Sequence, residues 1–306
     1  MAATPENTAG ANLLGTALRH IQRDIDDAFD LLLPVPDDSR AKLVEAMRYA
    51  AIGGGKRVRP LLVVATAEMY GVDRQAAVRV GAALEAVHVY SLIHDDLPAM
   101  DNDDTRHGKP TVHKAWDEAT AVLAGDSLLT FAFELLSDPA TSGDPFTRIE
   151  LVQTLANASG THGMAGGQMM DIAAETAGDL DLATITRLQQ LKTGALLCAG
   201  VELGAILGKV APEGRRHLRA YARDIGLAFQ IVDDLLDHEG DEGKAGKALR
   251  KDAEAGKATF VSLLGATRAR EQARLLIDQA VGHLASHGAE ADTLRALARF
   301  IVERDR

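Results

Sequence analysis

Several residue types are scarce in this 306-residue sequence, which has one cysteine, Cys198, and nine prolines. A single cysteine excludes an intramolecular disulfide framework and a cysteine-based zinc cluster, and it is typical of a reducing compartment. We therefore expect a cytoplasmic protein. The first ten residues, MAATPENTAG, lack the basic and apolar regions of a signal peptide. We expect residues 1–10 to be flexible.

Long apolar runs and an excess of positive charge are also lacking. Apolar runs such as residues 61–67 fall well short of the roughly 18 residues of a membrane helix, so we expect no membrane span. The 33 Lys and Arg residues against 44 Asp and Glu residues give a formal net charge of −11. Because an acidic chain repels a polyanion, we expect no binding to nucleic acid. Any phosphate chemistry must depend on a local basic patch.

Helix-forming segments rich in Ala and Leu are abundant. Apolar residues recur at helical spacing, without sustained period-two alternation, in residues 41–51, 76–97, 115–136, 180–207 and 215–236. We predict an all-α bundle of about ten or more helices with little or no sheet. Residues 80–97 and 218–236 are apolar on nearly every face, which is typical of central helices. The loop at 137–145 is too short for an interdomain linker, so we expect one domain spanning residues 1–306.

Both predicted central helices end in acidic residues. Residues 95–104 contain Asp95, Asp96, Asp101, Asp103 and Asp104, and residues 233–242 contain Asp233, Asp234, Asp237, Glu239, Asp241 and Glu242. Neither segment contains Lys or Arg. Asp233 and Asp237 share a helix face, where like charges cost about 0.2–0.5 kcal/mol in solvent and more when buried. A counter-ion would remove this repulsion.

Each acidic segment alone could be a solvated helix end. The strings IHDDL at residues 93–97 and IVDDL at residues 231–235 nevertheless look like one device used twice. Two such ends favour a cation site facing one cavity. Ligation by carboxylates without cysteine favours Mg²⁺, with Mn²⁺ as the alternative, over zinc.

Asp101 needs a break in the helix to join Asp95. On an undistorted helix, six residues place Asp101 about 240° around the axis from Asp95. Pro98 disfavours helical geometry at Leu97 and lacks a hydrogen-bond donor. We therefore predict that the chain leaves the helix before Met100 and brings Asp101 back toward Asp95.

A basic loop, GGGKRVRP at residues 53–60, places flexible backbone beside Lys56, Arg57 and Arg59. This arrangement suits phosphate oxygens. It is not a nucleotide-binding P-loop, because the GxxxxGK[ST] spacing is absent, and a glycine turn with solvated charges is the alternative interpretation. Other cations near the acidic segments are Arg106, Lys192, Lys244, Lys247 and Lys257. As a set, these residues predict a site for metal-bridged diphosphate.

The ordered motifs resemble those of the trans-isoprenyl diphosphate synthases, the polyprenyl synthetase family, and are most similar to bacterial farnesyl diphosphate synthases. The resemblance covers about residues 43–265 and includes GGGKRVRP, HVYSLIHDDLPAMDNDDTRHGKPTVH, AVLAGDSLL, GGQMMD, LKTGALL, GLAFQIVDDLLD and a GKxT pattern at 256–259. It implies an isoprenoid synthase-type helical bundle around a deep central apolar cavity, usually homodimeric. It also implies a Mg²⁺-dependent prenyltransferase, with three ions per active site, that condenses isopentenyl diphosphate with dimethylallyl or geranyl diphosphate.

The resemblance further implies roles for individual residues. Metal ions would be bound by Asp95 and Asp101, with Asp96 in support, and by Asp233 with Asp237. The allylic diphosphate would be held by Arg106, Lys192, Lys257 and Lys247, and isopentenyl diphosphate by Lys56, Arg59 and His88. The reacting region would be lined by Gln168, Asp171, Thr193 and Gln230. His88 lies seven residues before Asp95, on about the same helix face.

Two positions depart from the family pattern. His107 stands where a second arginine is common, at a position associated with isopentenyl diphosphate. Histidine is charged only when protonated, so we expect weaker binding at high pH. Arg250 replaces a glycine of the usual GKxxGxD pattern, and we expect it to affect the loop that carries Lys247.

Product length is expected to depend on Tyr90 and Ser91. Tyr90 lies five residues before Asp95, about 7.5 Å along a helix, and its ring favours a floor near C15, the farnesyl product. An ordinary core tyrosine is the alternative interpretation. Other functions left open are geranyl or geranylgeranyl diphosphate synthase, terpene cyclase and a non-catalytic partner subunit.

Overall fold

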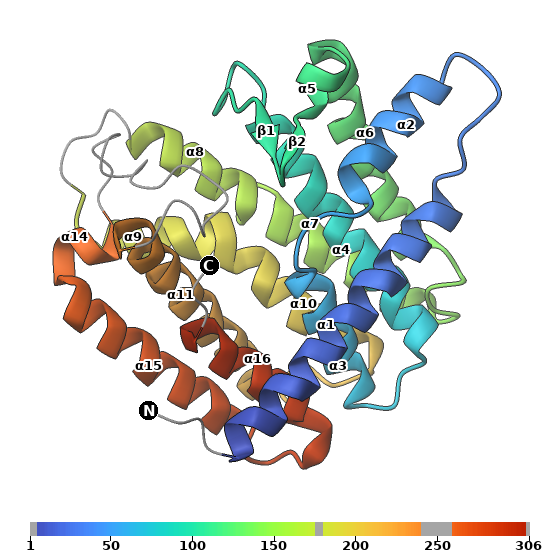
Figure 1. The fold of residues 1–306 in the computed structure, drawn as a ribbon. Coiled ribbons are helices and arrows are strands. Elements are labelled where there is room, and N and C mark those ends of the chain that lie inside the picture. The colour runs from blue at the N-terminus through green and yellow to red at the C-terminus, as the bar shows by residue number, and fades with distance from the viewer. Residues whose placement is uncertain (1–4, 175–179, 240–258, 304–306) are drawn as a thin grey trace. The chain divides into compact units, whose positions relative to one another are not determined.

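The structure is a computed structural model that describes residues 5–174, 180–239 and 259–303 (Figure 1). Its α-helices are α1 (Pro5–Leu32), α2 (Ala41–Ala51), α3 (Val58–Glu68), α4 (Arg74–Asp95), α5 (Val112–Ala115), α6 (Glu118–Ser137), α7 (Pro145–Ser159), α8 (Met164–Ala174), α9 (Leu182–Gln189), α10 (Ala195–Leu207), α11 (Arg216–Glu239), α14 (Phe260–Leu264), α15 (Ala266–His283) and α16 (Asp292–Glu303). A π-helical turn, η1, spans Gln190–Gly194, and a 3₁₀ turn, η2, spans Ala289–Ala291. Within these ranges the strands are β1 (Thr105–Arg106) and β2 (Lys109–Pro110), paired antiparallel. The prediction of an all-α fold is confirmed.

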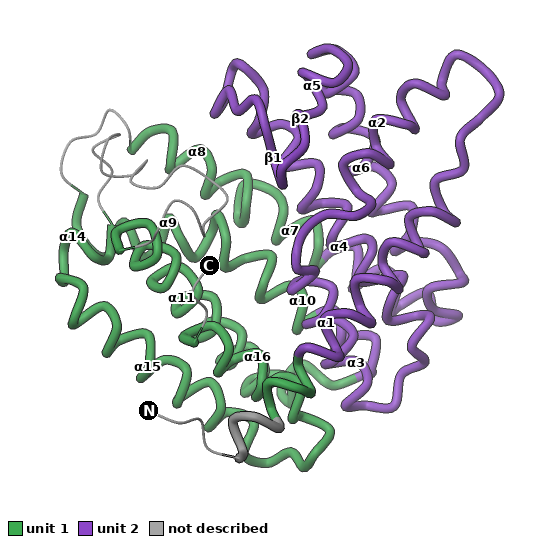
Figure 2. The backbone as a smooth tube through the Cα atoms, viewed as in Figure 1, with its two compact units in different colours: residues 1–14, 154–202, 210–306 green, residues 15–153, 203–209 purple. Residues whose placement is uncertain are grey.

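The chain divides into two compact units (Figure 2). One comprises residues 15–153 and 203–209, and is called here the first-aspartate unit because it contains residues 95–104. The other comprises residues 1–14, 154–202 and 210–306, and is called the second-aspartate unit because it contains residues 233–242. Residues 5–10, expected to belong to a flexible start, begin helix α1. A single domain spanning the whole chain stays a prediction.

In the first-aspartate unit, α4 is the central helix, packed between α3 and α6. Every residue from 80 to 87 is buried, as predicted for a helix that is apolar on nearly every face. The helix begins at an Asp73 cap, whose carboxylate accepts a hydrogen bond from the Ala76 N–H. Helix α6 approaches α4 closely at Gly125, where a Cβ atom would lie only 2.1 Å from Nε2 of His94. Small residues therefore allow α6 to pack at the acidic end of α4.

In the second-aspartate unit, α11 packs against α15 and α16. The buried Tyr221 hydroxyl donates a hydrogen bond to the Leu294 carbonyl at 2.7 Å. The prediction that residues 218–236 are enclosed on nearly every face is wrong for the first part of this segment, because Arg219 and Arg223 are exposed. From 225 to 237 no residue is exposed. The enclosed part of α11 is therefore the stretch that leads into and includes the aspartates.

Three helical segments, Arg74–Asp95, Glu118–Ser137 and Leu182–Leu207, are long and apolar enough to cross a membrane by length and composition. In the fold, 67%, 50% and 67% of these windows are buried. Core helices require the same apolar character. The absence of a membrane span stays a prediction.

Candidate active site

The first acidic segment leaves the helix where the sequence predicted. Helix α4 ends at Asp95, and the Leu97 N–H then bonds to the His94 carbonyl at 3.1 Å. The Asp101 N–H donates to the Asp95 carbonyl at 2.8 Å. Asn102, with a φ of 51°, reverses the chain. The predicted return of Asp101 to Asp95 is confirmed, so the backbones of these two aspartates meet at the end of α4.

A β-hairpin with a two-residue turn follows, and the turn contains His107, one of the two departures from the family pattern. His107 and Gly108 connect β1 to β2 with φ values of 52° and 76°, which is the backbone of a type I′ turn. His107 lies against the basic loop, since a Cβ at Gly54 would be 3.7 Å from its Cδ2 atom. The hairpin thus places His107 beside the residues that were predicted to bind isopentenyl diphosphate.

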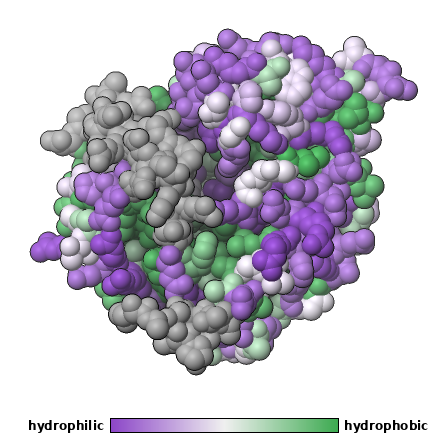
Figure 3. Space-filling view, in the orientation of Figure 1, coloured by the Kyte–Doolittle hydropathy of each residue, from purple (hydrophilic) through white to green (hydrophobic). Residues whose placement is uncertain are grey.

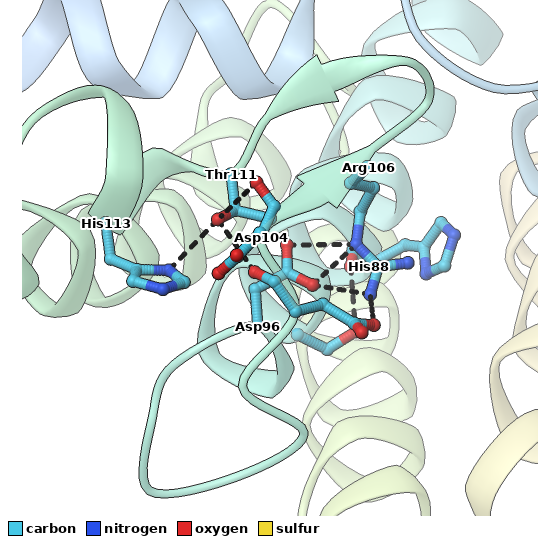
Figure 4. Close-up of polar contacts among 8 residues, drawn as sticks. His88, Asp96, Asp104, Arg106, Thr111 and His113 are labelled. Atoms are coloured by element: carbon cyan, nitrogen blue, oxygen red, sulfur yellow. Dashed lines mark hydrogen bonds and ion pairs between the residues drawn. The ribbon is translucent and has the colours of Figure 1, made fainter. Parts of the chain in front are cut away.

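Asp96 and Arg106, both predicted site residues, bind one another (Figure 4). The Arg106 Nε atom lies 2.9 Å from both Asp96 carboxylate oxygens, and Nη2 lies 2.6 Å from Oδ1. Asp96 is 3% exposed, and burial raises its pKa even though the guanidinium opposes this shift. Such a bidentate pair fixes the plane of the guanidinium. Asp96 therefore orients Arg106 at the edge of the acidic segment.

The basic loop contains one cation that is not exposed to solvent. Arg57 is 3% exposed and forms ion pairs with Asp26 and Glu85. The sequence had placed it with Lys56 and Arg59 as a candidate ligand of phosphate, and its burial assigns it to the interior instead. Lys56 is exposed and Arg59 is partly exposed.

His88, Tyr90 and Ser91 lie on α4 in the two turns before Asp95. Burial, and then the charges of Arg59, Arg106 and Arg57, lower the pKa of His88 well below its usual value. The Tyr90 ring meets the His94 ring edge-on with centroids 5.7 Å apart, and burial raises the Tyr90 pKa. The Ser91 hydroxyl donates to the His88 carbonyl at 2.7 Å. The structure thus brings neutral His88 close to Arg59, one of the two cations that were predicted to share its substrate.

The second acidic segment repeats one feature of the first. Asp234 is buried, and its Oδ2 atom accepts a hydrogen bond from the Phe260 N–H at 2.8 Å. Asp233 and Asp237 are partly exposed on one face of α11. In both DD pairs, the second aspartate is therefore buried and bound within its own unit, whereas the first is more accessible.

Five further predicted residues lie on η1, α8 and α11 in the second-aspartate unit. The Lys192 ammonium donates to Asp171 of α8 at 2.6 Å, and Thr193 lies within the π-helical turn. Gln168 is on α8 and Gln230 is buried on α11. Helix α8 touches the η1 backbone, since a Cβ at Gly167 would lie 2.1 Å from the backbone nitrogen of Lys192. Lys244, Lys247, Arg250 and Lys257 lie outside the described residues.

Comparison with known proteins decides the family. A model of the polyprenyl synthetase family matches residues 40–298. The chain belongs to the polyprenyl synthetases. It is 45% identical to the farnesyl diphosphate synthase of Escherichia coli, over 90% of this chain and 93% of that protein. It is also 42% identical to a geranylgeranyl pyrophosphate synthase of Catharanthus roseus, over 96% and 81% of the two chains.

Solved structures agree with this placement. A crystal structure of an FPP/GFPP synthase from Zymomonas mobilis has a TM-score of 0.87 and 58% identity, covering 96% of this chain and 99% of that one. A geranyltransferase from Legionella pneumophila has a TM-score of 0.84 and 31% identity, covering 98% of both chains. This polyprenyl synthetase is accordingly a prenyltransferase with the isoprenoid synthase helical fold.

The carboxylates of this polyprenyl synthetase fit a magnesium ion that is shared with a substrate. Among the described residues, no three His, Cys, Asp or Glu side chains form a group that could hold a metal ion. Mg²⁺ is usually bound through one or two carboxylates plus substrate phosphates, not by an all-protein cage. Asp95 and Asp101, joined through their backbones, supply an oxygen-only set of this kind.

Two residues that support the acidic loop were not predicted from the sequence. The Thr111 hydroxyl donates to the Asp103 carbonyl at 2.9 Å, and the Thr111 N–H donates to the Asp104 carbonyl at 3.0 Å (Figure 4). His113 Nδ1 lies 3.1 Å from the same hydroxyl. Both side chains are buried. Their position in TVH, directly after the hairpin, is the signal that could have identified them.

Proposed function

We propose that this prenyltransferase condenses isopentenyl diphosphate with dimethylallyl and then geranyl diphosphate to make farnesyl diphosphate. The observation that carries the proposal is the return of Asp101 to Asp95 beside an Arg106 that Asp96 orients. Relatives named farnesyl diphosphate synthase, 42–45% identical to this chain, support the choice of product. The enzyme acts in the cytoplasm as a homodimer, and size-exclusion chromatography with light scattering tests the dimer.

The proposed roles follow from charge and position. Asp95 and Asp101, with Asp233 and Asp237, hold the metal ions, and Arg106, Lys192, Lys247 and Lys257 hold oxygens of the allylic diphosphate. When bound, three Mg²⁺ ions, or Mn²⁺, supply Lewis-acid polarisation of the diphosphate. Arg106 suits the task because a fixed guanidinium stabilises charge that develops on the leaving oxygen. The allylic C–O bond then breaks without an enzyme nucleophile.

The second substrate is assigned to the basic loop. Lys56, Arg59 and His88, with His107, hold isopentenyl diphosphate, and its double bond attacks the allylic carbocation. The side-chain oxygens of Thr193 and Gln230 stabilise that cation, with Gln168 and Asp171 beside them. The released diphosphate takes the proton that is lost when the new double bond forms. An apolar, water-poor cavity protects the cation from quenching.

Chromatography of the products formed from dimethylallyl and isopentenyl diphosphates with Mg²⁺ tests the proposal. We expect farnesyl diphosphate as the main product and no reaction in EDTA. Longer products would favour geranylgeranyl diphosphate synthesis, which the Catharanthus roseus relative suggests, and geranyl diphosphate alone would favour a C10 synthase. Reaction of an allylic diphosphate without isopentenyl diphosphate would favour a terpene cyclase. No turnover by the isolated protein would favour a non-catalytic partner subunit.

A further inference from the structure

Arg57 is the buried cation of the basic loop, and its guanidinium is bound on two sides. Nη1 donates to Glu85 Oε1 at 2.8 Å, and Nη2 donates to Asp26 Oδ1 at 2.7 Å. Nη2 also donates to the Ala51 carbonyl at the end of α2. The side chain is 2% exposed, so it is enclosed by protein, and its charge is neutralised by carboxylates from α1 and α4.

The same contacts fix the backbone of the loop. Asp26 Oδ1 accepts a second hydrogen bond, from the Gly53 N–H at 3.3 Å. Gly53, Gly55 and Arg57 have φ values of 76°, 72° and 52°, in the left-handed region that an ordinary residue adopts rarely. A non-glycine residue such as Arg57 keeps this conformation only when its surroundings hold it. Asp26 therefore fixes both ends of the turn that contains Lys56.

Glu85 extends this network to the helix that carries His88. The two residues are three apart on α4, and so lie one turn apart on one face of the helix. The charges of Arg59, Arg106 and Arg57 all act on His88 and lower its pKa, after the larger effect of burial. The cluster thus joins α1, the basic loop and α4 within the first-aspartate unit.

We propose that Asp26, Arg57 and Glu85 are positioning residues for isopentenyl diphosphate. Arg57 does not touch the substrate; it holds the loop in the conformation that presents Lys56 and Arg59 next to His88. The inference rests on the proposed function, which takes Lys56, Arg59 and His88 as the ligands of isopentenyl diphosphate. Removing Arg57 itself would leave two carboxylates without their cation and would disturb folding. The test therefore uses Asp26, whose side chain is 23% exposed.

Asp24 provides a matched control on the same helix. Its side chain is 31% exposed and also pairs with an arginine, Arg74, at 2.7 Å, but it has no bond to the basic loop among those described. The variants Asp26→Ala and Asp24→Ala each remove one aspartate–arginine pair of α1. Steady-state kinetics with each substrate varied, and thermal unfolding, are measured for both.

We expect Asp26→Ala to raise KM for isopentenyl diphosphate by about tenfold, because small misplacements of binding groups cost this much or more. KM for geranyl diphosphate and kcat should remain within about twofold of the parent, since the acidic segment keeps its own contacts. Asp26→Asn should restore most of the affinity, because its amide oxygen still accepts from Arg57 and Gly53. Asp24→Ala should leave all three constants unchanged.

Three results would overturn the inference. One is an unchanged KM for isopentenyl diphosphate in Asp26→Ala, and another is an equal loss for both substrates, which would indicate a general structural role. A third is a matching KM increase in Asp24→Ala. Lys56→Ala and Arg59→Ala separate this inference from the proposed function. If neither raises KM for isopentenyl diphosphate, the assigned substrate site is wrong; if both do and Asp26→Ala does not, only the positioning role fails.

Discussion

His107 occupies a turn position where burial and two arginines work against its positive charge. Burial, and then Arg106 and Arg57, lower its pKa below the ordinary value of 6.5. The imidazole is therefore largely neutral at pH 7. Its charge is lost as the pH rises through a value below 6.5. The weakening of isopentenyl diphosphate binding that was expected at high pH should therefore occur below neutral pH.

We predict that KM for isopentenyl diphosphate rises as the pH is raised toward 6.5, because a histidine whose pKa is lowered loses its proton below that pH. His107→Arg restores a permanent charge at the hairpin turn and should remove this part of the pH dependence. Both proteins are assayed in parallel, so that ionisation of the substrate affects them equally. Identical pH profiles would show that His107 does not contribute charge to binding.

Tyr90 is a candidate for the residue that limits product length. Its ring lies one turn before His94 and meets that ring edge-on. Tyr90→Ala removes the ring, and we predict a shift of the main product from C15 to C20 or longer, measured by chromatography. Tyr90→Phe keeps the ring and should keep the product. An unchanged distribution in Tyr90→Ala would identify Tyr90 as an ordinary core residue.

Sequence reasoning succeeded at single residues where a local rule applied. Pro98 disfavours helical geometry at Leu97, and this effect, with the helical angle between Asp95 and Asp101, predicted the return of Asp101. Arg57 had no such signal, because its neighbours Lys56 and Arg59 are equally basic and the partners Asp26 and Glu85 lie 31 and 28 residues away. Contacts made by folding, not by spacing, decide which of three adjacent cations is buried.

At the scale of elements, the two acidic helix ends use their paired aspartates differently. Asp96 binds Arg106 and Asp234 binds the first N–H of α14, and both are buried. Asp95 and Asp233 precede them and are partly exposed. One aspartate of each pair therefore holds the local structure, and the other is the one to which the proposed function assigns a cation.

The second pair gives a test of this division. We predict that Asp234→Ala lowers the free energy of unfolding by about 1–3 kcal/mol, because the Phe260 N–H is left buried without its acceptor. Asp233→Ala should change stability little but reduce kcat by at least about tenfold through loss of a metal ligand. Denaturant unfolding and steady-state kinetics measure both variants. Equal effects of the two substitutions on both quantities would contradict the division of roles.

Helix positions were predicted well where apolar spacing was unbroken. The expected segment 76–97 became α4, and 215–236 became α11 with small changes at each end. The expected helix 180–207 is interrupted by the π-helical turn at 190–194. That turn keeps apolar spacing almost unchanged, so periodicity does not detect it, yet it contains Lys192 and Thr193. π-Helical turns are frequently found at functional sites.

At the scale of the whole molecule, the excess of negative charge over positive charge is found in the two acidic segments. They contain five and six carboxylates and no Lys or Arg, which equals the net charge of −11. Hydrophilic side chains also predominate over the hairpin and α2 on the face of the first-aspartate unit seen in Figure 3. A diphosphate that approaches acidic segments without a cation is repelled. Binding of the diphosphate and of Mg²⁺ should therefore depend on each other.

We predict that Mg²⁺ and pyrophosphate together raise Tm by more than pyrophosphate in EDTA, which can occupy only the basic loop. A ligand at 100 times its Kd stabilises the folded state by about 2.7 kcal/mol, which corresponds to a shift of roughly 5 °C for a chain of this size. Asp101→Asn should reduce the shift, and Asp278→Asn, which changes an exposed carboxylate on α15, should not. A full shift in EDTA would show that the basic residues bind diphosphate without a metal ion, and the coupling of metal and substrate would then be wrong.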